Sequence, residues 1–343
     1  MWYAKYTEPR TIELRPLQRP KLRSPDDLLI RVAYAGICDD DLLIYAMNER
    51  SLEWPGLAPT EGHEFSGIVL EAGENAAVNF RPGDRVSGLA WSFCGNCYYC
   101  KNGMESHCVN QTVTSTFATE LVLNQRQVCR LPSSVSLKDG VFTDPITYCL
   151  HTSLHHIAHP PYPNVLIFGT TAMALITLQL AKLQGAATVV VVEQNVEKAA
   201  LARSLGADQV IDPMAQNALS AAMELTGGIG YHVIYEMARH SPYLQFATKV
   251  LAYQGSVWLA CMYESSELSL SELFMKEGAI RFFALAPYML MEAMRIMPQL
   301  RLAPLVSRVF PFQQINEAFR FQTQPGSGKA LLEITPPERL GTL

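Results

Sequence analysis

The sequence has little charge, and the charge it has is not gathered into blocks. Lys and Arg number 27 and Asp and Glu number 32 among 343 residues, which gives a formal net charge of −5. A protein whose main partner is nucleic acid is expected to carry a basic patch or stripe. No basic block is found, so the composition argues against that partner.

Long apolar runs are lacking as well. No run reaches the roughly 20 residues that a membrane-spanning helix needs. The start, MWYAKYTEPRTIEL, does not resemble a signal peptide. We therefore expect a cytoplasmic protein with no membrane partner. In that compartment the eight cysteines are expected to bind metal rather than to form disulfides.

What is present indicates two domains. Apolar residues make up 49% of the chain, enough for sizeable cores. Residues 1 to about 155 hold short strand-like runs separated by turns rich in Gly, Pro and Asp, which predicts a β-rich, barrel-like domain. From about 163 to 285, predicted strands alternate with helical patterns: Val165–Gly169, Thr188–Glu193, Gln209–Ile211, His232–Glu236, Ser256–Cys261 and Ile280–Leu285. That alternation predicts a parallel sheet with helices on both faces.

Four cysteines lie on one short stretch, CGNCYYCKNGMESHC. They are Cys94, Cys97, Cys100 and Cys108, with the spacing C-x2-C-x2-C-x7-C. Four thiolates on such a loop can surround Zn²⁺ with no open position, which is a structural site. An iron–sulfur cluster is the rival interpretation, and cysteines without a metal are a third.

Three further fragments carry residues of the metal-ligand type. They are GICDDD with Cys38, EGHEFSG with His63 and Glu64, and FTDPITYCLH with Asp144. Each is weak evidence alone, because a single Cys or His more often lies in a core or on a surface. Their order along the chain is what gives them weight.

In that order the segments resemble the medium-chain, zinc-dependent alcohol dehydrogenases, above all the polyol, sorbitol-like branch. The resemblance covers nearly the whole length, and its specific parts are the cysteine loop and the run from Gly62 to Val86. The matching segments are Gly36–Asp41, Gly62–Glu64, Cys94–Cys108, Asp144–Pro145, the unit that starts at Val165, and Ser327–Lys329.

The resemblance implies an α/β fold with two domains. A β-rich, GroES-like catalytic domain would comprise 1–155 and 286–343, with the structural-zinc lobe at 94–108. A Rossmann domain with a doubly wound parallel sheet would occupy 156–285. Relatives of this kind lead us to expect a homodimer or homotetramer.

The resemblance also implies a catalytic zinc site. Cys38 and His63 would bind the ion, and Glu64 and Asp144 would complete the set, one directly and one through water. An open position on the ion would let it act as a Lewis acid on a substrate oxygen. Asp144 stands where the polyol branch usually has Glu, one methylene longer, so which carboxylate ligates directly is left open.

Asp40 departs from the family pattern. It stands where relatives have a Ser or Thr that relays the proton from the substrate alcohol. One interpretation is that Asp39, Asp40 and Asp41 are acids at a helix N-terminus, favoured by the helix dipole. The other is that Asp40 faces the zinc and acts as general base. The added negative charge would favour a polyhydroxylated or cationic substrate, such as an amino sugar or aminocyclitol.

The turn after Val165–Gly169 has one glycine where the dinucleotide fingerprint has three. Gly169 keeps the first, Thr171 replaces the second and Ala174 the third. The Thr171 side chain takes space near the phosphates, although the start of the following helix still attracts anions. Residues expected at the cofactor phosphates are Gly169, Thr171, Ala172, Met173 and Ala174.

Other positions restore the expectation of a nicotinamide cofactor. Glu193 ends the second strand, where an acid binds the ribose 2′-hydroxyl of NAD and repels the 2′-phosphate of NADP. A surface acid at a strand end is the alternative. Lys198 stands at the family's basic position. Arg239 replaces a glycine that in relatives passes near the nicotinamide ribose, and His232 replaces an aspartate.

These residues predict the oxidation of a secondary alcohol to a ketone, or the reverse, on a small-molecule substrate. NAD is expected rather than NADP, with catalytic and structural Zn²⁺. Two alternatives remain open at this point. One is a redox-neutral epimerase with tightly held NAD on the same scaffold. The other is a binding protein that kept the fold but lost the cofactor.

Overall fold

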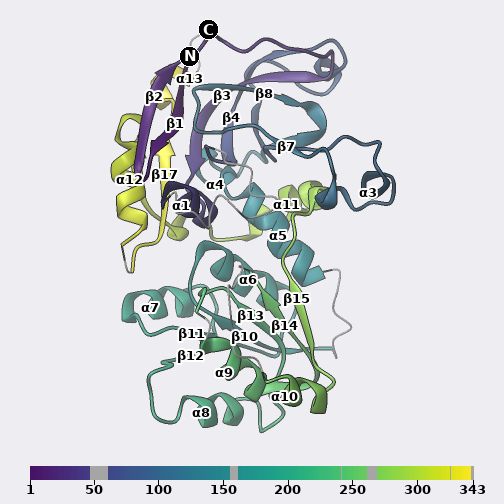
Figure 1. Ribbon diagram of the computed structural model, residues 1–343, viewed down its shortest axis with the longest axis vertical. Coiled ribbons are helices and arrows are strands. Elements are labelled where there is room, and N and C mark those ends of the chain that lie inside the picture. Colours follow the sequence, from purple (N-terminus) through teal and green to yellow (C-terminus); the bar gives the residue numbers. More distant parts are fainter. Residues whose placement is uncertain (47–60, 155–160, 241, 261–268, 325, 341–343) are drawn as a thin grey trace. The chain divides into compact units, whose positions relative to one another are not determined.

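The computed structural model describes residues 1–46, 61–154, 161–240, 242–260, 269–324 and 326–340 (Figure 1). The chain divides into two compact units, Met1–Thr147 with Ala286–Leu343, and Tyr148–Leu285. Within the ranges just given, a search for helices with the length and apolar character of a membrane span finds none.

A seven-stranded sheet is the frame of the first unit (Figure 1). Its strands run in the order β16, β17, β3, β4, β5, β9, with β8 also paired to β3. Their bounds are β3 (Asp27–Gly36), β4 (Glu64–Ala72), β5 (Arg85–Gly88), β8 (Glu120–Asn124), β9 (Val128–Arg130), β16 (Val306–Pro311) and β17 (Lys329–Glu333).

Smaller elements surround this sheet. Two antiparallel pairs join β1 (Trp2–Glu8) to β2 (Thr11–Pro16) and β6 (Trp91–Ser92) to β7 (Thr112–Val113). The helices of this part are α1 (Asp39–Ala46), α3 (Tyr98–Lys101), α4 (Leu137–Gly140), α5 (Thr143–Leu154), α11 (Leu290–Ile296), α12 (Ile315–Gln322) and α13 (Pro337–Leu340). Of these, α5 continues into the second unit.

Strand β3 organises the core of the first unit. It is buried along almost its whole length because its side chains meet apolar residues on both faces. Ile30 and Val32 belong to the main cluster, which also holds Phe65 and Phe319. On the other face Ala33, Tyr34, Val141 and Leu331 form a smaller cluster. Because β17 pairs antiparallel with β3, a strand near the C-terminus completes a sheet that begins near the N-terminus.

The second unit contains a six-stranded sheet that is parallel throughout (Figure 1). Its strands are β10 (Asn164–Phe168), β11 (Thr188–Val192), β12 (Gln209–Ile211), β13 (Tyr231–Glu236), β14 (Leu251–Leu259) and β15 (Ala279–Phe282). Its helices are α6 (Ala172–Leu183), α7 (Val196–Ser204), α8 (Ala218–Glu224), α9 (Pro242–Val250) and α10 (Leu270–Met275).

The order of these strands reverses beside β10. From β10 the chain adds β11 and β12 on one side, then returns to place β13, β14 and β15 on the other. Right-handed crossovers therefore put helices on both faces of the sheet. Alternate residues of β10 are buried on both faces, with Leu166 and Phe168 in one apolar cluster and Val165 and Ile167 on the opposite side. The prediction of a doubly wound Rossmann sheet is confirmed, and ligands bind such sheets at the point of reversal.

The strand bounds differ in detail from those expected. β12 has the predicted bounds, β11 and β13 differ by one residue at one end, and β10 begins and ends one residue earlier than predicted. β14 begins five residues early, at Leu251, since Leu251 and Ala252 are buried before an exposed turn at Gln254 with positive φ. Cys261, the predicted end of that strand, lies outside the described residues. The last strand ends at Phe282 rather than at Leu285.

Candidate functional site

Cys38, His63 and Glu64 converge at one end of β3 and β4. Each offers one ligand atom, and the three atoms lie within 4.8 Å of one another. Cys38 follows β3 by two residues and Glu64 is the first residue of β4, opposite Gly36 in the antiparallel register. The pairing of these two strands therefore brings together residues about 25 positions apart in the sequence.

Two glycines make room for this cluster. A Cβ on Gly36 would lie 2.0 Å from Glu64 Oε2 and 2.8 Å from Val141 Cγ1. Gly62 has φ +79°, and a Cβ there would lie 2.6 Å from the Phe117 ring. Neither position tolerates a side chain unless its neighbours move, so both glycines serve the placement of His63 and Glu64.

Asp144 lies close to this cluster, in the first turn of α5. It is 3% exposed, and its Oδ1 is buried with no hydrogen-bond partner. Its oxygen is not among the three ligand atoms within 4.8 Å, but its charge acts on His63 and Glu64. Burial, together with the Glu64 carboxylate, raises the pKa of Asp144 to about 7 although His63 opposes the shift.

The three acids of α1 occupy its first turn, as one of the two interpretations predicts. Asp41 is fully buried and its Oδ2 accepts the backbone N–H of Cys38 at 2.8 Å, which fixes the approach to the helix. Asp40 is half-buried and acts electrostatically on both Cys38 and Asp144. Asp40 therefore combines the helix N-terminal position with proximity to the ligand-type residues.

The electrostatics of the cluster favour a cation. Burial, with Asp40, raises the pKa of the Cys38 thiol to about 11. Burial alone would lower the pKa of His63, but the Cys38 sulfur and the nearby carboxylates raise it well above its ordinary value. Buried sulfur, imidazole and carboxylate groups with unpartnered oxygens are a donor set that suits Zn²⁺. These residues fit a zinc ion.

Lys329 is a member of this site that the sequence reasoning did not single out. Its Nζ lies 2.6 Å from Glu64 Oε1, and the side chains are 7% and 1% exposed. Lys329 is the first residue of β17, which the sheet places beside β3. The Ser327–Lys329 segment was recognised only as part of the family pattern, and its pairing with Glu64 is visible only in the fold.

The four-cysteine lobe forms a second cluster. One sulfur from each of Cys94, Cys97, Cys100 and Cys108 lies within 4.8 Å of the others. Two sulfur–sulfur distances are 3.5 and 4.0 Å, close to the roughly 3.8 Å that tetrahedral ligands 2.3 Å from zinc would have. Backbone N–H groups of Asn96 and Cys97 lower the pKa of Cys94 to about 6, which favours the thiolate. The lobe fits a structural zinc ion.

The turn after β10 holds the residues expected at the cofactor. Gly169 has φ +88°, and a Cβ added there would lie 3.0 Å from Ala238 Cβ. Thr171 is the N-cap of α6, and its hydroxyl accepts the backbone N–H of Ala174 at 3.2 Å. The first turn of a helix has further N–H groups without partners in the helix. Those of Ala172 and Met173 therefore remain for an anion.

Glu193 and Lys198 lie at the carboxyl end of β11 and in the first turn of α7. The Glu193 carboxylate is held on both sides, by the Thr170 hydroxyl at 2.6 Å and by the Asn195 backbone N–H at 2.8 Å. The Lys198 backbone N–H donates to the Asn195 side chain, which caps α7. Glu193 therefore stands at the edge of the sheet where a ribose is expected.

Arg239 follows β13 and is exposed, with φ +55°. This left-handed conformation suits glycine, the residue at this place in the family pattern. The buried Glu236 accepts the backbone N–H groups of Ala238 and His240, on either side of Arg239, and so holds the strained backbone. The residues expected at the cofactor thus gather along the carboxyl ends of β10, β11 and β13.

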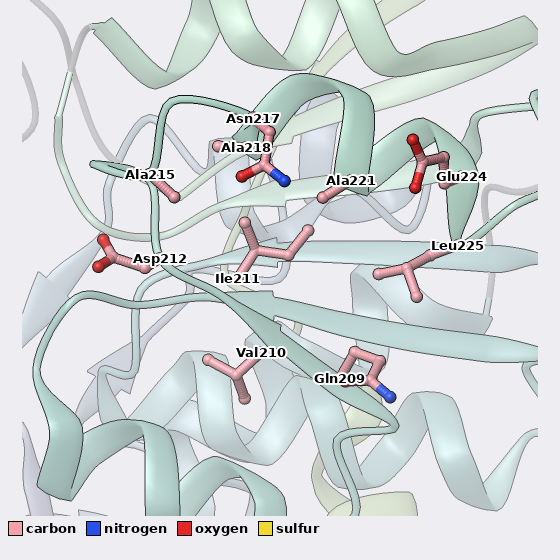
Figure 2. A pocket seen from close by; sticks show the side chains of 10 residues that line it. All are labelled: Gln209, Val210, Ile211, Asp212, Ala215, Asn217, Ala218, Ala221, Glu224 and Leu225. Atoms are coloured by element: carbon pink, nitrogen blue, oxygen red, sulfur yellow. The ribbon is translucent and has the colours of Figure 1, made fainter.

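A separate cavity of about 410 Å³ opens between the edge strand β12 and α8 (Figure 2). In Figure 2, Asp212 and Glu224 lie at opposite ends of it and alanines of α8 lie between them. None of the residues assigned to the metal or the cofactor lines this cavity. Its walls are Gln209, Val210, Ile211, Asp212, Ala215, Asn217, Ala218, Ala221, Glu224 and Leu225.

Comparison with known proteins agrees with both units. The alcohol dehydrogenase GroES-like domain family matches residues 24–133, and the zinc-binding dehydrogenase family matches residues 172–297. L-threonine 3-dehydrogenase of Pyrococcus abyssi is 30% identical over 257 residues, which cover 73% of this chain and 72% of that protein. D-arabitol-phosphate dehydrogenase of Enterococcus avium is 25% identical over 325 residues, 91% of each chain.

A solved structure gives the same result. A zinc-binding dehydrogenase from Sinorhizobium meliloti 1021, bound to NADP, superposes with a TM-score of 0.86 at 25% identity and covers 97% of this chain and 99% of its own. The match extends over both the GroES-like and the Rossmann parts of the chain. The protein is an NAD(P)-linked oxidoreductase that belongs to the medium-chain, zinc-dependent alcohol dehydrogenase family.

Proposed function

We propose that this protein oxidises a secondary hydroxyl of a polyol-like substrate to a ketone, or catalyses the reverse, with NAD(H) and zinc. The observation that carries the proposal is the convergence of Cys38, His63 and Glu64 within 4.8 Å. Relatives whose names include arabitol phosphate and threonine support a substrate that carries hydroxyl groups. When bound, zinc supplies Lewis-acid chemistry and the nicotinamide supplies hydride-transfer chemistry.

The two carboxylates have different roles in this proposal. Glu64 is paired with Lys329, but its Oε2, like Asp144 Oδ1, is buried without a hydrogen-bond partner. Of the two carboxylates, Glu64 offers an oxygen within 4.8 Å of the Cys38 and His63 ligand atoms. We therefore assign Glu64 to the ion together with Cys38 and His63, and we assign to Asp144 the support of the site. Zinc content should fall more in Glu64→Gln than in Asp144→Asn, measured by atomic emission. The opposite order would exchange the two roles.

Asp40 is assigned to the substrate. Its carboxylate, beside Cys38 and Asp144, accepts the hydrogen bond of the reacting hydroxyl and is our candidate for the proton acceptor. The carboxylate of Asp40 adds negative charge beside Glu64 and Asp144, which favours a polyol, a sugar, or an amino sugar or aminocyclitol with a positive charge.

Paired substrates test the charge argument. Asp40→Ser should raise KM for an amino alcohol more than KM for its neutral analogue, since only the first loses an opposite charge. Asp39→Ser removes the same charge from the same helix turn and is the matched control. Equal effects of Asp40→Ser on the two substrates would rule out the cationic preference.

The cofactor assignment is tested by nicotinamide fluorescence. Glu193, an acid at the end of β11, supports NAD rather than NADP. We expect saturable binding of NADH with NADPH much weaker, followed by turnover of a polyol or amino sugar that Cys38→Ala abolishes. Bound NAD in a denatured extract, with no exchange, would favour the epimerase. Neither binding nor bound NAD would favour a binding protein.

We also propose a homo-oligomer, as family resemblance suggests. β15 is an edge strand with Phe282 63% exposed, and the preceding α10 exposes Leu270, Phe274 and Met275 at 70–82%. Such apolar exposure beside an open edge is typical of an interface. Light scattering should give a dimer or tetramer mass, and Phe282→Lys should lower it. A monomer mass for the unchanged chain would contradict the proposal.

A further inference from the structure

One hydrogen bond joins the turn after β10 to the end of β11. The Thr170 hydroxyl donates to Glu193 Oε2 at 2.6 Å, and Thr170 is 9% exposed. The other oxygen, Oε1, accepts the Asn195 backbone N–H at 2.8 Å. The carboxylate that the proposed function assigns to the cofactor ribose is therefore fixed by two protein donors.

The strand register explains why this bond forms. β10 and β11 are parallel neighbours with Phe168 opposite Val192, so the residues that follow them emerge at the same edge of the sheet. Gly169 donates its backbone N–H to Val192 O at 3.0 Å and turns the chain with φ +88°. That turn directs Thr170 toward Glu193. The position of the Thr170 hydroxyl is therefore set by the backbone of the turn, and the side chain itself is almost buried.

We propose that Thr170 is a positioning residue that determines cofactor specificity through Glu193. The inference rests on the proposed function, in which NAD is the cofactor. Two lone pairs of the carboxylate are used by Thr170 and Asn195, and the remaining ones accept the ribose 2′-hydroxyl. A 2′-phosphate meets a carboxylate that cannot rotate away without losing two hydrogen bonds to a charged acceptor.

Rigidity matters here because basic residues follow two strands at the same edge of the sheet. Lys198 stands in the first turn of α7, and Arg239 follows β13. A carboxylate free to turn toward solvent would leave space for a phosphate at this edge. The Thr170 hydroxyl removes that option. Discrimination against NADP then depends both on the negative charge of Glu193 and on the fixed position of its carboxylate.

The test compares the dissociation constants of NADH and NADPH by fluorescence titration of the full-length protein. In Thr170→Val, which keeps the side-chain shape without the donor, the Kd ratio of NADPH to NADH should fall about tenfold. Thr170→Ser keeps the hydroxyl and should retain the ratio of the unchanged protein. Thr170→Ala is a second variant without the donor, in which the same fall is expected, should Thr170→Val fold poorly.

A coupling measurement separates positioning from a general disturbance of the turn. Glu193→Gln should lower the ratio by itself, and adding Thr170→Val should then change it no further, because Thr170 acts through the charge of Glu193. A retained ratio in Thr170→Val and Thr170→Ala, with NADH still preferred by the unchanged protein, would overturn the inference alone. Preference of the unchanged protein for NADPH would overturn both the inference and the NAD assignment.

Discussion

Gly36 shows how one residue without a side chain sets the geometry of the metal centre. It faces Glu64 across the β3–β4 pair, and the space of its missing Cβ is filled by Glu64 Oε2 and Val141. A methyl group here must displace the carboxylate or the strand. The contact is with the far end of a side chain, so Glu64 is expected to move first.

We therefore expect Gly36→Ala to reduce both zinc content and stability. The free energy of unfolding should fall by about 1–3 kcal/mol, the usual range for an overpacked site. Denaturant unfolding and atomic emission measure the two effects. In a Glu64→Ala background the same substitution should cost less. An equal loss in both backgrounds would show that Glu64 is not what the methyl group displaces.

Some groups of site residues could be predicted from the sequence and others could not. Cys94, Cys97, Cys100 and Cys108 could be grouped from spacing alone, because a loop of 15 residues leaves them little freedom to separate. The pairing of Lys329 with Glu64 could not, since 265 residues separate them and only the strand order brings them together. The Thr170–Glu193 bond is not predictable from the sequence either, because Thr170 occupies a variable position of the dinucleotide fingerprint.

At the scale of elements, His232 joins two neighbouring strands. It lies in β13, and its Nδ1 accepts the backbone N–H of Asn164 at the start of β10, at 3.0 Å. A histidine that accepts a hydrogen bond at Nδ1 has a neutral ring, with its one proton on Nε2. Burial lowers the pKa of His232 below its ordinary value of 6.5.

This shift predicts a pH dependence of stability. In the unfolded chain this histidine takes up a proton near pH 6.5, whereas in the folded protein it does so only at a lower pH. The contribution of His232 to the free energy of unfolding is therefore fully present above pH 6.5 and falls as the pH drops below it. His232→Asn keeps an acceptor without a titrating group and should flatten this part of the curve. Denaturation of both proteins between pH 7.5 and about 5 measures it. Parallel curves would contradict the role of His232.

The β17–β4 contact through Lys329 and Glu64 is a buried ion pair between elements. Removing one partner of such a pair leaves a charge without compensation. We expect Lys329→Met to cost about 3 kcal/mol of unfolding free energy. The control is Arg295→Met, because Arg295 pairs with Glu292 at 2.9 Å in the same unit but both side chains are exposed, at 76% and 45%. It should cost less than about 1 kcal/mol, and similar costs would contradict the argument.

The sequence predicts the bounds of the strands better than it predicts contacts between individual side chains. The predicted bounds of β10 to β13 lie within one residue of the observed ones at each end, and β10, β11 and β13 are apolar runs buried on both faces. β14 begins earlier than the sequence predicts, since the exposed Tyr253 and Gln254 break its apolar run after Leu251 and Ala252. A strand that changes from buried to exposed and back has no clear period in the sequence.

On the scale of the whole molecule, the residues assigned to metal and those assigned to the cofactor fall in different units. Both clusters of metal-ligand type belong to the first unit, and the turn assigned to the dinucleotide belongs to the second. Metal binding to folded ligands is also folding free energy. Calorimetry should therefore show two unfolding transitions. The midpoint temperature of the first unit should fall after chelation of metal, and that of the second unit should rise with NADH. A chelator that lowers both transitions equally would contradict this division.

The first unit is split in the sequence, and this has a consequence for biosynthesis. The ligand-type residues Cys38, His63, Glu64 and Asp144 leave the ribosome before the Rossmann insertion, whereas β17 with Lys329 follows that insertion. Domains generally begin to fold in the order in which they emerge. A nascent chain therefore carries its ligand-type acids without their buried lysine until the Rossmann insertion has been made, and stop codons between residues 285 and 329 should release chains that bind less zinc than the unchanged protein.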